Sequence, residues 1–192
     1  IFDHINDSPL EHTIELRQSA LYTPLLSVRD SDIRQVASRL IALSSLSLDS
    51  NEMATLLRQL RLKADYDRAF KDPAAGPDTR TLFAAASESI TSTLVVFSLR
   101  LQTVEPTQLI WSECKRWTDD WFGYLHSTIG AQQIATEVKC SLIQQLGTFG
   151  GYSFPPEFRE QFTPAVDTLL SLLDNTETNI QASSFEALGK IL

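Results

Sequence analysis

One segment of the sequence, from Trp111 to His126, combines tryptophans, charged residues and a histidine, and is where chemistry is most readily sought. On a helix, residues three or four positions apart lie on the same side. Trp111, Lys115, Phe122 and His126 then form one stripe, in which aromatic side chains lie beside charges. Aromatic and basic side chains are the usual anchors of protein interfaces. The spacing therefore predicts a protein-binding groove along this stripe.

The neighbouring stripe of the same helix is more apolar and is predicted to face the core. Its members are Ile110, Cys114, Trp117, Trp121 and Leu125. A second candidate surface is basic. Arg58, Arg61 and Arg68 give one helix a basic side, interrupted by Asp65 and Asp67, which is typical of a solvated face but could also receive an acidic peptide.

Residues that would support catalysis or metal binding are not grouped in this sequence. The three histidines, His4, His12 and His126, are far apart, and no Cys/His spacing matches a metal site. Nucleophile, phosphate-binding and dinucleotide-binding motifs are also missing from the sequence. We therefore expect no enzyme activity, no cofactor and no metal.

The composition is that of a folded, intracellular protein. Its 192 residues are 43% hydrophobic and 21% charged, in the globular range. No uninterrupted apolar run approaches the roughly 18–20 residues of a membrane helix, so we expect no membrane partner. Two cysteines are too few for a disulfide scaffold. These features favour the cytoplasm or the nucleus.

The net charge of −8 is unevenly spread and bears on the choice of partner. Residues 81–192 hold 6 Lys/Arg against 12 Asp/Glu, whereas residues 1–80 hold 10 against 12. Binding to a phosphate backbone normally relies on clustered basic residues. The charge distribution therefore disfavours a nucleic-acid partner, and other proteins are the expected partners.

Helical periodicity covers most of the chain, and no stretch alternates with period two between turns. The pattern predicts an all-α protein of eight helices in four hairpins, at about 8–47, 50–102, 106–148 and 155–192. Asp49 and Glu52 form a capping box before the third helix. The Pro- and Gly-rich residues 73–79 predict an exposed loop.

Two details of the helices are predicted more finely. The helix at about 32–47 has an apolar face that we expect to be core, formed by Ile33, Val36, Ala37, Leu40 and Leu43. The helix at about 132–148 is expected to end at Gly147, with Gly150 and Gly151 beyond it as a stop signal.

Three segments of the sequence repeat. Leu172-Leu173 is followed after six residues by Ile180–Gly189, and Leu25-Leu26 is followed after six residues by Ile33–Ala37. Val138–Gly147 can be laid on Ile180–Gly189 at an offset of 42 residues. These segments resemble the HEAT repeat, whose second helix opens on Val-Arg and closes on Ala-Leu-Gly. Glu186-Ala187-Leu188-Gly189 carries that close most clearly.

The resemblance implies a HEAT-like α-solenoid, in which neighbouring hairpins stack and share one elongated core. It also implies a ladder pairing Asp30 or Asp32 with Arg34. The expected function is a non-enzymatic scaffold or adaptor for other proteins, as one segment of a longer solenoid that continues into further repeats.

Two alternatives remain open from the sequence. One is a self-contained helical bundle that binds a ligand or peptide in its core. The other, more remote, is an enzyme like the HEAT-like DNA glycosylases, whose concave face carries tryptophans and an aspartate. Trp111, Asp119 and Trp121 echo that set, but they do not share one helix face.

Overall fold

The computed structural model describes residues 22–103, 108–131, 134–151 and 162–191. Seven α-helices and no strands lie in these residues, so the all-α prediction is confirmed. The α-helices are α2 (Ser31–Ser44), α3 (Ser50–Lys63), α4 (Pro77–Thr103), α5 (Gln108–Ile129), α6 (Thr136–Gly151), α8 (Thr163–Leu172) and α9 (Thr178–Ile191). Shorter turns are η1 (Thr23–Ser27), η2 (Ser45–Ser47) and the π-helical η3 (Asp67–Lys71). Most of the helix predicted at 8–28 lies outside the described residues.

Helix starts follow the local sequence closely. The Asp49 carboxylate accepts the backbone N–H groups of Asn51 and Glu52, and the Glu52 carboxylate accepts the N–H of Asp49, which confirms the capping box. Helix α4 begins at Pro77, because proline lacks the N–H that the first turn of a helix does not use. The predicted loop at 73–79 is consequently shorter, since its last three residues are helical.

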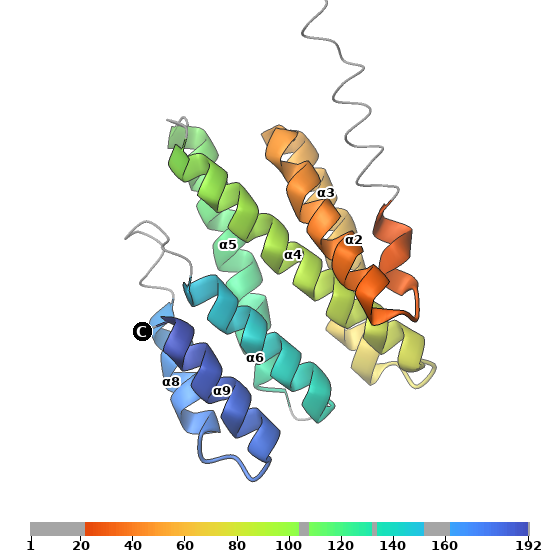
Figure 1. Ribbon diagram of the computed structural model, residues 1–192, viewed down its shortest axis with the longest axis vertical. Coiled ribbons are helices and arrows are strands. Elements are labelled where there is room, and N and C mark those ends of the chain that lie inside the picture. The colour runs from red at the N-terminus through yellow and green to blue at the C-terminus, as the bar shows by residue number, and fades with distance from the viewer. Residues whose placement is uncertain (1–21, 104–107, 132–133, 152–161, 192) are drawn as a thin grey trace, which may run out of the picture.

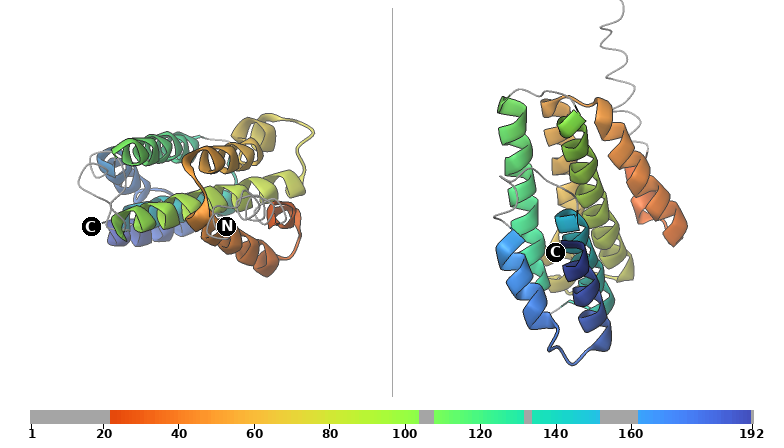
Figure 2. Two further views of the ribbon diagram at one scale, coloured as in Figure 1. Left: turned by 90° about the horizontal axis from the view of Figure 1, so that it is seen from above. Right: turned by 60° about the vertical axis from the view of Figure 1, so that its left-hand side comes forward.

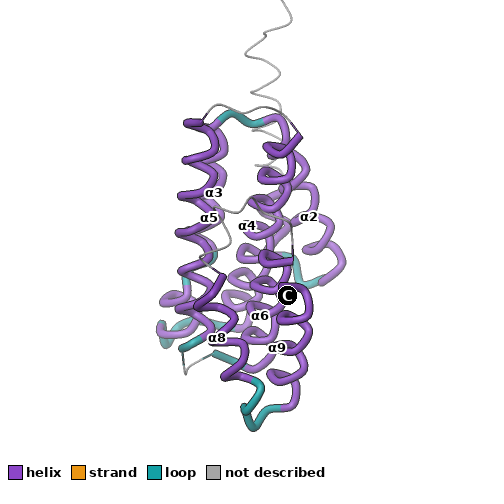
Figure 3. The backbone as a smooth tube through the Cα atoms, turned by 90° about the vertical axis from the view of Figure 1, so that its left-hand side faces the viewer, coloured by secondary structure: helices purple, strands orange, loops and turns teal. Residues whose placement is uncertain are grey.

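The helices form two layers, and successive helices along the chain belong alternately to one layer and the other (Figure 1). One layer contains α2, α4, α6 and α9, and the other contains α3, α5 and α8, as the view along the layers makes clear (Figure 3). The predicted hairpin partners within the described chain touch each other: α3 with α4, α5 with α6, and α8 with α9. The most extensive contacts, however, join α2 to α4 and α6 to α9 within one layer.

Helix α4 lies at the centre of the protein (Figure 2). It contacts α2 and α6 in its own layer and α3 and α5 in the other layer. Its small buried residues, among them Ala85, Ala86 and Ser89, allow neighbouring helices to approach. By length and mean hydropathy alone, Pro77–Gln102 could cross a membrane, although it contains no long uninterrupted apolar run. Within its most apolar window, 67% of the residues are buried inside the protein, as in a core helix.

The predicted core face of α2 is confirmed at Ala37, which is buried, and is wrong for Ile33, Val36 and Leu43, which lie on the outside. Ile33, Val36 and Leu43 are 42%, 54% and 55% exposed. Beside Ala37, the buried face carries three residues outside the predicted set: Ser38, Ile41 and Ala42. Three of these four side chains are small, which lets the α2 and α4 backbones approach each other closely.

Asp30, Asp32 and Arg34, the positions that match the HEAT ladder, form no ion pair with one another. The Asp30 carboxylate caps α2 by accepting the N–H groups of Asp32 and Ile33. The Arg34 guanidinium donates through Nη1 to the carbonyl oxygens of Val28 (2.7 Å) and Arg29 (2.6 Å). Arg34 therefore holds the turn before α2.

Helix α6 does not end at Gly147, and this prediction is also wrong, because the helix continues to Gly151. A Cβ placed on Gly147 would lie 2.6 Å from Ala187 Cα. One on Gly150 would clash with Ile191 Cγ1, and one on Gly151 would lie 3.0 Å from the Lys190 carbonyl oxygen. These glycines mark the face along which α6 and α9 cross at close range.

Both end helices of the α2–α4–α6–α9 layer expose apolar side chains. At one end are Ile33, Val36 and Leu43 of α2; at the other is Phe185 of α9, which is 73% exposed. A Cβ placed on Gly189 would meet no atom within 4 Å, so there is open space beside this residue on the same helix. Each end helix of the layer therefore exposes apolar side chains among its polar ones.

Candidate protein-binding groove

A groove between α3, α4 and α5 brings together residues from two of the segments singled out in the sequence. Its volume is about 280 Å³. We call it the aromatic groove. It is lined by Ala54, Leu57, Arg58 and Arg61 of α3, Ile90 and Leu94 of α4, and Trp117, Asp120 and Trp121 of α5.

Trp121 is held firmly at the base of the aromatic groove. Its indole Nε1–H donates to Thr91 Oγ1 at 2.9 Å, and its ring stacks on Tyr124 with centroids 5.2 Å apart. Thr91 in turn donates to Gln145 Oε1 of α6 at 3.0 Å. A buried polar chain thus links α5, α4 and α6 behind the groove, and it fixes the orientation of the indole.

Arg61 is fixed in position at the α3 wall. Its guanidinium carbon lies 3.3 Å from the centre of the Tyr124 ring and 5.8 Å from that of Trp121. Its Nη1 donates to the carbonyl oxygen of Ala64 at 2.6 Å. The Tyr124 hydroxyl donates to the same carbonyl at 2.8 Å and accepts the N–H of Tyr66. Cation–π contact and hydrogen bonding together restrict the rotation of the guanidinium.

The two walls of the aromatic groove differ in charge. Arg58 and Arg61 project from α3, one helical turn apart, and Asp120 lies on α5. Neither arginine forms an ion pair within the described part of the chain. Arg68, the third member of the predicted basic surface, lies on η3 and does not line the groove.

The predicted stripe on α5 is divided between internal and outer positions. Phe122 is buried and meets Phe162 edge-on, with centroids 5.1 Å apart. His126 Nε2 lies 2.6 Å from Thr168 Oγ1. The Thr168 hydroxyl also lies 3.0 Å from the carbonyl oxygen of Pro164, to which it can donate. Phe122 and His126 thus lie on the side of α5 that faces α8.

Trp111 and Lys115 are the other half of that stripe. Both are half-buried, and Lys115 Nζ pairs with Asp119 at 2.6 Å. Binding by the Trp111, Lys115, Phe122 and His126 stripe stays a prediction. The groove that the structure does form is lined by Trp117 and Trp121, which the helical spacing had assigned to the core. Trp121 is buried as expected, at the base of the groove, whereas Trp117 is only half-buried.

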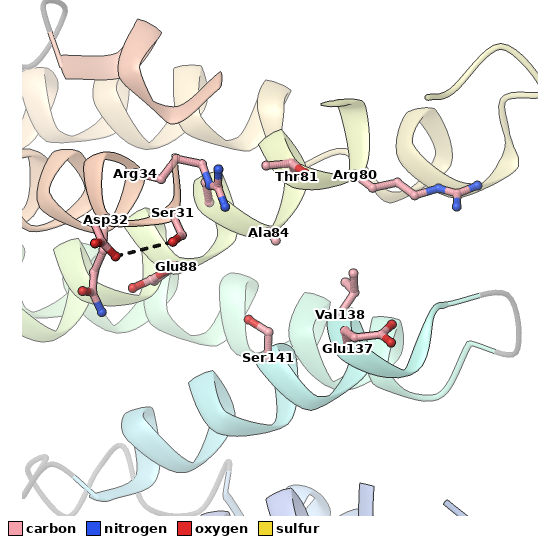
Figure 4. A pocket seen from close by; sticks show the side chains of 12 residues that line it. Ser31, Asp32, Arg34, Arg80, Thr81, Ala84, Glu88, Glu137, Val138 and Ser141 are labelled. Carbon is pink, nitrogen blue, oxygen red and sulfur yellow. Dashed lines mark hydrogen bonds between the residues drawn. The ribbon is translucent and has the colours of Figure 1, made fainter. Parts of the chain in front are cut away.

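A second hollow lies on the opposite side of α4, between α2, α4 and α6 (Figure 4). Its volume is about 480 Å³, and it is polar: Asp32, Arg34, Arg80, Glu88 and Glu137 are among its lining residues. Burial raises the pKa of Glu88, and the nearby Arg39 and Arg34 act in the opposite direction. We call this hollow the polar groove.

The raised pKa of Glu88 leads to a pH-dependent stability. Between its ordinary pKa of 4.5 and the higher folded value, the native state binds more protons than the unfolded state, so stability falls as pH rises through this window. The Glu88→Gln variant is therefore expected to melt at a higher temperature than the wild type at pH 7. This gain should shrink as the pH falls towards 4 in circular-dichroism melts.

Asp174→Asn is the control for the Glu88 measurement, because Asp174 is exposed and lies outside the polar groove. It changes the net charge equally. A Glu88→Gln gain that is the same at pH 4 and pH 7 would contradict the ionisation argument. A loss of stability at pH 7 would show that the arginines outweigh the desolvation.

Among the described residues, no group of three or more His, Cys, Asp or Glu side chains is placed to hold a metal ion. Cys114 is buried, with its Sγ 3.4 Å from Ser98 Oγ. Burial raises the pKa of this thiol, which opposes thiolate formation. Its place in the core is that of a packing residue.

Comparison with known proteins adds no relative. The chain matches no protein-family model, no curated protein and no solved structure. Its function must therefore be argued from its own residues.

Proposed function

We propose that this chain is a non-enzymatic scaffold or adaptor that binds other proteins, and that the aromatic groove is a binding site. The observation that carries the proposal is the joint presence of Trp117, Trp121, Arg58 and Arg61 around one hollow. Tryptophan and arginine dominate the energetics of protein interfaces, where they bury large areas and donate several hydrogen bonds. Here one of each is already restrained by internal contacts.

We further propose that the architecture is a HEAT-like α-solenoid segment. Alternation of two helix layers along the chain supports it, since each hairpin then repeats the placement of the one before. The exposed apolar residues of α2 and α9, the two end helices of one layer, support it too, because further repeats could cover them. Small-angle scattering that gave a shape inconsistent with the two-layer array would count against it.

The proposal includes location and partner class. Cys114 and Cys140 are free, in keeping with a reducing compartment such as the cytoplasm or nucleus. A chain with net charge −8 is poorly suited to nucleic acid, so proteins are the proposed partners and no cofactor is invoked.

Quantitative affinity capture from cell extract tests this function with three baits. They are the wild type, a groove variant carrying Arg58→Glu and Trp117→Ala, and Leu62→Ala, which alters a 69%-exposed residue of α3 outside the groove. Circular dichroism first establishes that all three are folded. We expect at least one protein to be retained by the wild type and Leu62→Ala and lost by the groove variant. Identical retention by all three baits would refute the groove as a binding site.

A further inference from the structure

The aromatic groove also carries information about the chemistry of its ligand. Resting on the function proposed above, we propose that it binds a short acidic segment of a partner protein, in which a large apolar side chain is followed closely by a carboxylate. The apolar side chain enters the groove, and the carboxylate is held by Arg58 and Arg61 on the α3 wall.

The size and lining of the groove define the apolar part of the ligand. Five of its nine lining residues are large and apolar or aromatic: Leu57, Ile90, Leu94, Trp117 and Trp121. The volume of about 280 Å³ lies just below the ~300–1,000 Å³ of clefts that enclose drug-sized ligands. It therefore suits one or two side chains of a protein segment better than a whole cofactor.

The arginines define the charged part. A guanidinium has five N–H donors, and Arg61 uses one of its groups on the Ala64 carbonyl. The protein has 24 acidic residues against 16 basic ones, yet no carboxylate of the described chain pairs with Arg58 or Arg61. Two neighbouring cations without an internal counter-ion are complementary to a carboxylate, which a guanidinium binds through two parallel hydrogen bonds.

Preorganisation makes Arg61 the more effective of the two. Tyr124 and the Ala64 carbonyl already hold its side chain, so little further rotamer freedom is lost on binding. Arg58 is exposed and makes no such contacts, so it contributes mainly charge.

Asp120 sets the orientation of the ligand. It lies on the α5 wall, opposite the arginines of α3, and gives the groove a positive and a negative side. The ligand carboxylate is consequently directed to α3.

A pair of matched peptides tests the ligand chemistry. The acidic probe is N-acetyl-Glu-Leu-Leu-Asp-Glu-amide, and the neutral probe replaces its acids by Gln and Asn. Titration followed by ¹⁵N–¹H chemical shifts, at low and at high salt, measures the affinity of each. We expect the acidic probe to bind at least fivefold more tightly, with shifts centred on the groove, and the advantage to shrink at high salt.

Arginine variants separate groove binding from general charge attraction. Arg58→Gln is expected to reduce, but not to abolish, the preference for the acidic probe, because Arg61 remains, and to leave the affinity for the neutral probe unchanged. Arg68→Gln is the matched control, since it removes the same charge from an exposed residue of η3 outside the groove, and it should change neither affinity. Trp117→Ala should weaken both probes.

Each contrary outcome has a defined meaning. Equal affinity for the two probes, equal effects of Arg58→Gln and Arg68→Gln, or no binding of either probe would overturn the proposed ligand chemistry. Preferential binding of single-stranded oligodeoxythymidine at the groove would overturn it in favour of nucleic acid. If capture of a partner still depends on the groove while the peptides fail, the binding function stands and only the acidic ligand is rejected; if both fail, so does the function.

Discussion

Replacing Gly147 with alanine is expected to destabilise the protein by about 1–3 kcal/mol, the usual cost of overpacking a tight contact. The new Cβ would lie 2.6 Å from Ala187 Cα and 2.7 Å from Ala187 Cβ. Backbone and Cβ atoms cannot rotate away, so α6 and α9 must separate along their main contact. Alanine's better helix propensity, worth about 1 kcal/mol over glycine, offsets only part of this cost.

Gly123→Ala is the matched control for Gly147→Ala. Gly123 lies within α5, is exposed, and has no atom within 4 Å of its Cβ position. The same substitution should therefore stabilise the protein by about 0.5–1 kcal/mol. Urea unfolding followed by circular dichroism measures both. If Gly147→Ala proved as stabilising as Gly123→Ala, that result would contradict the close approach of α6 to α9 at Gly147.

The second large effect is expected from Thr91→Val, at the centre of the buried polar chain. Valine has a similar shape to threonine but no hydroxyl, so the Trp121 indole N–H and the Gln145 carbonyl oxygen both lose their partner. Thr91, Trp121 and Gln145 are all buried. A buried polar group without a partner costs about 1–3 kcal/mol, so we expect a loss of about 2–4 kcal/mol in urea unfolding.

Thr93→Val provides the contrast, two residues along the same helix. The Thr93 hydroxyl is buried and has no hydrogen-bond partner. Replacing it by a methyl group removes a desolvated polar atom, so the expected change is neutral or stabilising. Equal losses at Thr91 and Thr93 would mean that the substitution acts through helix packing alone, and would contradict the role of the chain Trp121–Thr91–Gln145.

The Thr91 variant also links stability to the aromatic groove. Trp121 is oriented by its hydrogen bond to Thr91 of α4, whereas Arg61 is held by its cation–π contact with Tyr124 of α5. These supports come from residues far apart in the sequence. The groove is therefore a product of packing, with its two restrained anchors held by different parts of the core.

The sequence by itself determined the features whose causes are local. The helical class follows from periodicity, the start of α3 from the Asp49–Glu52 capping box, and the break before α4 from two prolines and a glycine within a few residues. Each depends on hydrogen bonds or backbone angles within about one turn of the residue concerned. The burial of Cys114 and Trp121 on α5 also followed from helical spacing.

Only the tertiary structure decided which neighbour each face meets. Val36 and Ala37 were both predicted to be core because both fit the apolar spacing, yet only Ala37 is buried and Val36 is exposed. Gly147 looked like a helix end because glycine often is one, but here it serves a close crossing with Ala187. Trp117 and Arg58 meet at one groove although 59 positions separate them in the chain. Periodicity reports that a face is apolar; the distance to the next helix, set by side-chain volume on both sides, determines whether that face is buried.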